Sequence, residues 1–163
     1  MAIRPRPARY LLPTLAMLML LSAFPGSGAA EDNQDSWLAY RANASRTAYQ
    51  SVSLDDNLAA AWTYQSTRAP RPAWPRSERM PFDRAQHTVV SDGKVFFGSS
   101  VDGRVMALDL QSGEIAWTVL TDGPIRFAPA IWKDRLLVAS DDGFLYALAI
   151  DDGRQLWKIG RPK

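Results

Sequence analysis

The sequence predicts an all-β fold built from repeated units of four antiparallel strands. Residues 103–117 match residues 143–157 at a constant offset of 40 positions. Both units consist of short apolar or alternating runs, and Asp-Gly or Ser-Gly pairs separate these runs. A repeat of this period indicates stacked structural units, and runs this short are typical of strands rather than helices.

The strands can be assigned in order along each unit. The first unit predicts strands at residues 86–91, 95–100, 104–110 and 114–120, and the second at residues 128–133, 135–140, 144–150 and 154–159. The offset between the second strands is 41, because one extra residue lies in the polar tip at residues 100–102. Four antiparallel strands in about 40 residues are the size of one β-propeller blade. We therefore predict a partial β-propeller with blades at residues 86–122 and 123–163.

Each unit ends in the same pattern of alanine, glycine and tryptophan: Ala107, Asp109, Gly113 and Trp117 in the first unit and Ala147, Gly153 and Trp157 in the second. This pattern resembles a tryptophan-docking motif of the PQQ-repeat family, which comprises quinoprotein-like and BamB-like β-propellers. The resemblance implies that the tryptophan docks between neighbouring blades, the glycine permits a close approach and the alanine leaves room for the ring.

The two motifs depart from the family pattern in their turns. Ser112 and Asp152 stand where threonine is usual, and Ala149 replaces the aspartate found at Asp109. An alanine side chain accepts no hydrogen bond. We therefore expect weaker side-chain hydrogen bonding in the turn of the second blade, without loss of the tryptophan packing.

The first 30 residues resemble a secretory signal peptide. Arg4, Arg6 and Arg9 precede a mostly apolar stretch at residues 10–24, and small residues follow up to Ala30. This order predicts export to the periplasm or the cell exterior, with cleavage after Ala30. The alternative is a retained membrane anchor, although the apolar stretch is shorter than the roughly 20 residues of a spanning helix.

Cleavage would leave 16 basic and 17 acidic residues, a formal charge of −1, so the composition gives no indication of nucleic-acid binding. The sequence contains no cysteine, which excludes disulfides and a lipid-modified cysteine at the cleavage site. We expect no membrane attachment after cleavage.

Residues between the signal peptide and the first blade divide into three parts. Residues 31–57 form an N-terminal extension, residues 58–66 an orphan propeller strand, and residues 67–85 a loop rich in proline and arginine. The orphan strand carries Trp62 and resembles the fourth strand of a blade whose other strands are missing, so we predict that it closes a ring. The alternative is a short helix from the alanine run at residues 59–61.

Candidate contacts to a ligand or partner lie in two segments. In the proline-rich loop, Arg71, Trp74 and Arg76 suit an acidic partner or anionic ligand, because arginine offers a fork of donors. The alternative is a solvated crossover. Arg126 lies in the connection between the blades, where a bond to a backbone carbonyl and a ligand contact are both open.

Two function classes agree with these observations. The first is a non-enzymatic protein-interaction or accessory scaffold, with no cofactor and with a protein or further propeller blades as partners. The second is the N-terminal part of a quinoprotein dehydrogenase, which would hold PQQ and calcium and oxidise an alcohol or sugar. We predict no catalytic residues and no metal site, since His87 is the only histidine and no cysteine is present.

The length of the chain also bears on what the protein forms and which partners it needs. A propeller needs about four to eight blades to close, and this sequence supplies two. We expect an N-terminal portion of a longer propeller, with several copies forming a ring as the alternative. In the open pair of blades formed by this sequence, Trp157 would lie on an apolar face without a following blade.

Overall fold

The computed structural model describes residues 36–70 and 87–161, all within the unit Asn33–Lys163. The predicted signal peptide and residues 71–86 lie outside the described residues, so the predictions for Arg71, Trp74 and Arg76 are not addressed by the structure.

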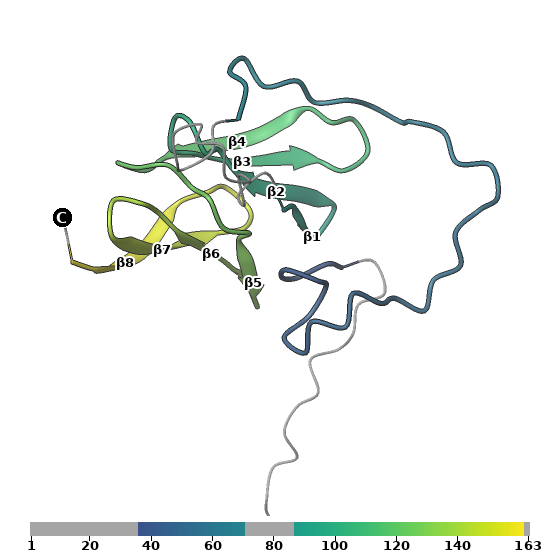
Figure 1. The fold of residues 1–163 in the computed structure, drawn as a ribbon, viewed down its shortest axis with the longest axis horizontal. Helices are drawn as coiled ribbons and strands as arrows, with labels where there is room; N and C mark the ends of the chain where they lie inside the picture. Colours follow the sequence, from purple (N-terminus) through teal and green to yellow (C-terminus); the bar gives the residue numbers. More distant parts are fainter. Residues whose placement is uncertain (1–35, 71–86, 162–163) are drawn as a thin grey trace, which may run out of the picture. The chain divides into compact units, whose positions relative to one another are not determined.

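Eight strands form two four-stranded antiparallel sheets in the described residues (Figure 1). The first sheet contains β1 (Val89–Ser91), β2 (Lys94–Gly98), β3 (Arg104–Asp109) and β4 (Ile115–Leu120). The second contains β5 (Ala130–Trp132), β6 (Arg135–Ala139), β7 (Phe144–Ala149) and β8 (Gln155–Gly160). In both sheets the strand order follows the sequence. The predicted all-β fold with two four-stranded blades is therefore confirmed.

Local turn chemistry fixes the hairpins. Asp92 and Gly93 join β1 to β2 with φ angles of 49° and 67°, the positive values that a two-residue type I′ turn requires. The inner strands β1 and β5 have three residues each and are shorter than predicted. Pro129 directly precedes β5, and it has no N–H to donate to the sheet.

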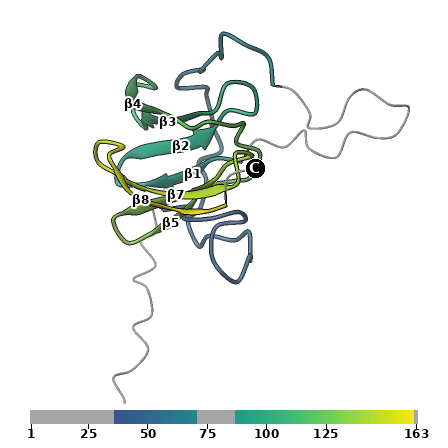
Figure 2. The same ribbon diagram turned by 90° about the vertical axis from the view of Figure 1, so that its left-hand side faces the viewer.

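The hydrophobic core lies between the two sheets, and the inner strands β1 and β5 lie beside each other (Figures 1 and 2). Phe96 and Val105 from the first sheet and Leu136 and Leu148 from the second are at most 1% exposed where the buried surfaces meet. Face-to-face packing of this kind buries the apolar face of each sheet, which stabilises the pair.

The N-terminal extension contacts both inner strands, which the sequence did not reveal. The Trp37 and Val90 backbones exchange two hydrogen bonds, with N···O distances of 2.8 and 2.9 Å. The Ile131 N–H donates to the Leu38 carbonyl at 2.7 Å. The extension therefore links the edge of β1 to β5 at the inner side of the blades.

The predicted orphan strand at residues 58–66 is neither a strand nor the alternative short helix in the structure. These residues make no backbone–backbone hydrogen bond to the described residues. Trp62 and Tyr64 are partly buried, whereas Ala61, Thr63 and Gln65 are exposed. The alternation is that of an extended segment, but a strand also needs a hydrogen-bonded neighbour, and the described part of the chain provides none.

Candidate functional site

Trp117 on β4 makes the principal contact between the two sheets. Its indole N–H donates to the Ile150 carbonyl at 3.0 Å, and its side chain is only 8% exposed. Gly153 lies under the ring with φ of +75°, and a Cβ at that position would lie 2.7 Å from the ring atom Cε3. Glycine is therefore required at position 153 both for its backbone conformation and for space.

The alanines of the two motifs lie next to the tryptophans of their own sheets. Ala107 is paired in register with Trp117, and Ala147 with Trp157. Both alanines are fully buried, at 0% exposure. A small side chain at these positions leaves the face of β3 or β7 open to the neighbouring indole ring.

Trp62 repeats the same contact on the other side of the first sheet. Its indole N–H donates to the Leu110 carbonyl at 2.9 Å, and a Cβ at Gly113 would lie 2.5 Å from its Cδ2 atom. Tyr64 packs against Phe97 with ring centroids 5.4 Å apart, and its hydroxyl lies 3.4 Å from the Met106 sulfur. Side chains rather than a strand ladder therefore hold residues 58–66 on the sheet.

The two turns that receive these tryptophans have the same backbone hydrogen bond but differ in their side-chain hydrogen bonds. Gly113 N–H donates to the Asp109 carbonyl at 2.9 Å, and Gly153 N–H donates to the Ala149 carbonyl at 3.0 Å. The Asp109 carboxylate also accepts from the Ser112 N–H at 2.8 Å, the Ser112 hydroxyl at 3.0 Å and the Gln111 N–H at 3.0 Å. The bond from the Ser112 N–H is the largest influence that lowers the Asp109 pKa. Ala149 has no counterpart to these side-chain bonds.

The outward face of the second sheet is the apolar surface most relevant to binding. Trp157 is 38% exposed, whereas Trp117 at the matching position of the repeat is 8% exposed. Leu145 is 37% exposed, whereas its counterpart Val105 is fully buried. We refer to Leu145, Trp157 and Ile159 as the β8 face. Within the described residues the Trp157 indole donates no hydrogen bond.

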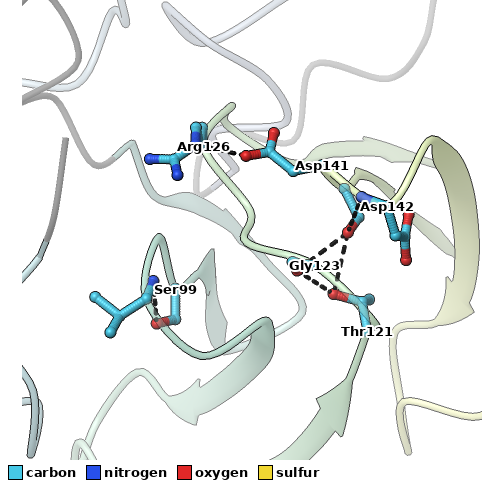
Figure 3. Close-up of polar contacts among 8 residues, drawn as sticks. Ser99, Thr121, Gly123, Arg126, Asp141 and Asp142 are labelled. Atoms are coloured by element: carbon cyan, nitrogen blue, oxygen red, sulfur yellow. Dashed lines mark hydrogen bonds and ion pairs between the residues drawn. The ribbon is translucent and has the colours of Figure 1, made fainter. Parts of the chain in front are cut away.

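A polar cluster connects the blades at the loops between β2 and β3, β4 and β5, and β6 and β7 (Figure 3). The Thr121 hydroxyl donates to the Gly123 carbonyl at 2.8 Å, and the Ser140 hydroxyl also reaches that carbonyl, at 3.1 Å. Arg126 pairs with the Asp141 carboxylate at 2.6 Å. One partner of Arg126 is therefore a carboxylate of the next loop, an interaction that neither sequence interpretation named.

Asp142 and Tyr146 form a second part of this cluster. The Tyr146 hydroxyl donates to the Asp142 carboxylate at 2.6 Å, and the Phe144 N–H donates to it at 2.9 Å. Burial, followed by the bond to Asp142, raises the pKa of Tyr146 to about 12. Burial alone would raise the Asp142 pKa, but the bonds from Tyr146 and Phe144 outweigh it, so the net pKa is lowered. The sequence analysis did not name this pair, although its two residues are only four positions apart.

A groove of about 520 Å³ lies between residues 64–70 and strands β2 and β3. Arg68, Asp102 and Arg104 are its charged lining residues. Arg104 pairs with one Asp102 carboxylate oxygen at 3.2 Å, while the other oxygen is buried without a hydrogen bond to the described residues. Apolar side chains, among them Phe97 and Met106, line the groove beside these charged residues.

The described residues contain neither a cluster of metal ligands nor a helical membrane span. No group of three or more His, Cys, Asp or Glu side chains lies close enough together to hold a metal ion in residues 36–70 and 87–161. His87, the single histidine, packs its ring against Tyr40 with centroids 4.5 Å apart. Nowhere in the described residues does the chain form a helix with the length and hydrophobicity of a transmembrane span.

Comparison with known proteins places this geometry in a family. The family described as outer membrane protein assembly factor BamB, a family of PQQ repeats, matches residues 45–163. The chain belongs to this BamB-like PQQ-repeat family. The match covers both sheets, the connection between them and the segment with Trp62.

Individual relatives of the BamB-like chain fall into two groups. The outer membrane protein assembly factor BamB of Shewanella oneidensis is 31% identical over 39% of the chain and 16% of its own length. The dehydrogenase subunit of a quinone alcohol dehydrogenase from Gluconacetobacter polyoxogenes is 31% identical over 42% of the chain and 11% of its own length. The chain thus spans less than a fifth of either relative.

A solved structure supports the fold independently. The quinohemoprotein alcohol dehydrogenase from Comamonas testosteroni superposes with a TM-score of 0.58 and 24% identity, over 77% of the chain and 19% of that structure. This likeness confirms that the two sheets are propeller blades.

Proposed function

We propose that this BamB-like chain is exported and acts as a non-enzymatic protein-interaction or accessory scaffold, with the β8 face as the surface that a protein partner or a further propeller blade covers. The observation that carries the proposal is the contrast between the two sheets. Trp117 and Val105 are 8% and 0% exposed, whereas Trp157 and Leu145 are 38% and 37% exposed. A contiguous exposed apolar face of this kind marks an interaction site.

The name of one relative supports the same proposal. The Shewanella oneidensis relative is an outer membrane protein assembly factor. A partner for the β8 face needs a matching apolar surface and a backbone carbonyl that can accept the Trp157 indole N–H. The buried Trp117 contact satisfies both requirements within the chain.

The second candidate is part of a PQQ- and calcium-dependent quinoprotein dehydrogenase. The 31% identity to a quinone alcohol dehydrogenase subunit favours it. PQQ carries several carboxylates, and arginine forks bind carboxylates well. Arg68 and Arg104 in the groove beside β2 and β3 are the described residues that suit such a group.

Two measurements test the proposal. The photoreactive residue p-benzoylphenylalanine at position 157 of the exported chain should cross-link to a protein, whereas the same residue at Phe127 should not. Phe127 is the matched control, because it is an aromatic residue that is 73% exposed and lies in the connection between β4 and β5, which contributes no residue to the β8 face. The purified chain, mixed with PQQ and Ca²⁺ and then desalted, should retain no quinone absorbance.

The dehydrogenase would be the better assignment if the desalted protein kept stoichiometric quinone and oxidised an alcohol. Loss of any protein cross-link at position 157 would remove the β8 face as the binding surface.

A further inference from the structure

Each of the two sheets has two edge strands, and a free edge offers unpaired backbone N–H and carbonyl groups to another chain. The inner edges, β1 and β5, are partly covered, because the N-terminal extension forms backbone hydrogen bonds with Val90 and Ile131. The outer edges are β4 and β8 (Figure 1). Among the described residues, β4 pairs only with β3 and β8 pairs only with β7. A further strand can therefore pair at these two outer edges.

The repeat gives the two outer edges different side chains. β4 has the sequence Ile-Ala-Trp-Thr-Val-Leu, with no charged residue, proline or glycine. Its counterpart β8 carries Lys158 and Gly160 at the positions where β4 has Thr118 and Leu120. A lysine on an edge strand opposes pairing with another chain, whereas β-branched and apolar residues suit a strand. β4 is therefore the outer edge that is competent for pairing.

The exposure of the β4 edge does not depend on a neighbouring sheet. Ile115 and Leu120 are 56% and 68% exposed. On β8, Lys158 shares a face of the second sheet with the buried Tyr146, its cross-strand partner, yet Lys158 itself is exposed. Packing between sheets thus buries the middle of a blade and leaves its outer edge open. Further blades on either side would therefore leave the edge of β4 accessible.

The outward backbone groups of β4 belong to Thr118 and Leu120. The Thr121 N–H donates to the carbonyl of Gly103, directly before β3, so the backbone groups of residue 121 point toward β3. Backbone groups alternate in direction along a strand with a period of two residues. Val119 therefore also points toward β3, whereas Thr118 and Leu120 point away and present their N–H and carbonyl groups at the free edge.

Acidic side chains lie at both ends of this edge. Glu114 directly precedes β4, and Asp122 follows it after one residue; both are exposed. They are eight positions apart in the sequence, which is about 26 Å along an extended strand. Arg104, beside Leu120 in register, is already paired with Asp102 at 3.2 Å. A segment with a basic residue at each end and uncharged residues between them matches this edge in length and charge.

We propose that the edge of β4 binds an extended segment of another protein, about eight residues long, which is rich in uncharged β-branched residues and basic at both ends. The segment adds a strand to the four-stranded first sheet through the outward backbone groups of Thr118 and Leu120. This surface is separate from the β8 face. It gives the chain a second mode of binding, which does not depend on what covers the β8 face.

A peptide of sequence Lys-Val-Thr-Val-Thr-Val-Thr-Lys, with fluorescein at its N-terminus and an amide at its C-terminus, serves as the probe. Fluorescence anisotropy should show saturable binding with a dissociation constant below about 1 mM. Thr118→Pro removes an outward N–H, a change that an edge strand tolerates because this N–H does not bond to β3. It should weaken binding of the probe at least about tenfold.

Lys158→Pro is the matched control, because it makes the same change at the equivalent position of β8. It should leave the affinity for the probe unchanged. Thr118→Lys, which copies the residue of β8, is a second variant that keeps the backbone N–H. It should weaken binding of the basic probe at least about threefold. Far-UV circular dichroism checks that every variant keeps its strands.

Amide hydrogen exchange measured by NMR tests whether the bound probe forms a strand. The probe should slow exchange of the Thr118 and Leu120 amides, which are free at the edge, and should leave the Val119 amide unchanged. A probe with proline in place of its central valine should bind at least about tenfold more weakly. Glu114→Gln should weaken the lysine-flanked probe about two- to fivefold and should not affect a probe with serine at both ends.

Strand addition at β4 is overturned if the probe shows no saturable binding, or if folded Thr118→Pro and Thr118→Lys bind it as tightly as the original protein. Sedimentation velocity distinguishes pairing between copies. If the original chain self-associates through this edge and the probe does not bind, the occupant is a second copy and the inference is wrong. A failed cross-link at position 157 would remove the β8 face as a binding surface but would leave the binding of the probe unaffected.

Discussion

Replacing Trp117 with alanine should destabilise the protein far more than the same change at Trp157. Trp117 is 8% exposed and donates a 3.0 Å hydrogen bond to the Ile150 carbonyl. Deleting a buried aromatic side chain costs about 3–5 kcal/mol of the free energy of unfolding. We expect the upper part of that range, because Gly153 has no side chain to fill the cavity and a buried carbonyl loses its donor.

The matched variant is Trp157→Ala, since the repeat gives both tryptophans the same local sequence setting. Trp157 is 38% exposed, so its removal should cost only about 1 kcal/mol, the typical value for a point substitution. Trp117→Phe separates packing from hydrogen bonding. It keeps a ring but loses the indole donor, and should cost about 1–3 kcal/mol.

Urea unfolding followed by far-UV circular dichroism measures these differences without relying on tryptophan fluorescence. A loss of 4 kcal/mol with a slope of about 2 kcal/mol/M lowers the midpoint by roughly 2 M. The measurements belong at low protein concentration, so that self-association does not contribute. Equal losses for Trp117→Ala and Trp157→Ala would refute the reasoning, because they would mean that the second sheet does not bury Trp117.

Three further predictions concern single contacts, and a fourth concerns the predicted signal peptide. Gly153→Ala should destabilise the fold by more than Gly93→Ala, because Gly93 has a similar positive φ but no atom within 4 Å of an added Cβ. Gly93→Ala should therefore cost only the backbone strain, about 1–2 kcal/mol. Urea midpoints compare the two variants, and equal losses of stability would exclude a steric contribution at Gly153. Since burial and Asp142 raise the Tyr146 pKa to about 12, stability should fall as pH rises from about 10 to about 12, and Tyr146→Phe should remove this dependence in unfolding measured at each pH. The lowered Asp142 pKa stabilises the fold above pH 3.8, a contribution that is lost as pH falls through the folded-state pKa. Asp142→Asn should therefore lose less stability than the original protein as the pH is lowered through this range, and an unchanged loss of unfolding free energy would contradict this. Mass spectrometry of exported protein should find Glu31 as the first residue, whereas a retained Met1 on a membrane-bound product would indicate an anchor.

Some of the candidate site could be predicted and some could not. Trp117, Gly153 and Ala107 follow from a motif of fixed spacing, and the structure brings Trp117 and Gly153 together across the blades. Arg126 was a reasonable candidate, but its pairing with Asp141 depends on where the next loop lies. Contacts between residues far apart in sequence carry no local pattern, so single-sequence reasoning does not find them.

The sequence by itself determined the strands, the turns and the repeat, because alternation and positive-φ turn residues are local properties of the chain. Asp92 and Gly93 specify a tight hairpin wherever they occur. Only the tertiary structure decided which surfaces are covered. Trp117 and Trp157 have equivalent local sequences, yet one is 8% and the other 38% exposed, because a sheet packs against the first and none of the described residues covers the second in the same way. Trp62 shows the same dependence: its indole N–H donates to the Leu110 carbonyl and its ring packs over Gly113, while its backbone forms no strand in the absence of a hydrogen-bonded neighbour among the described residues.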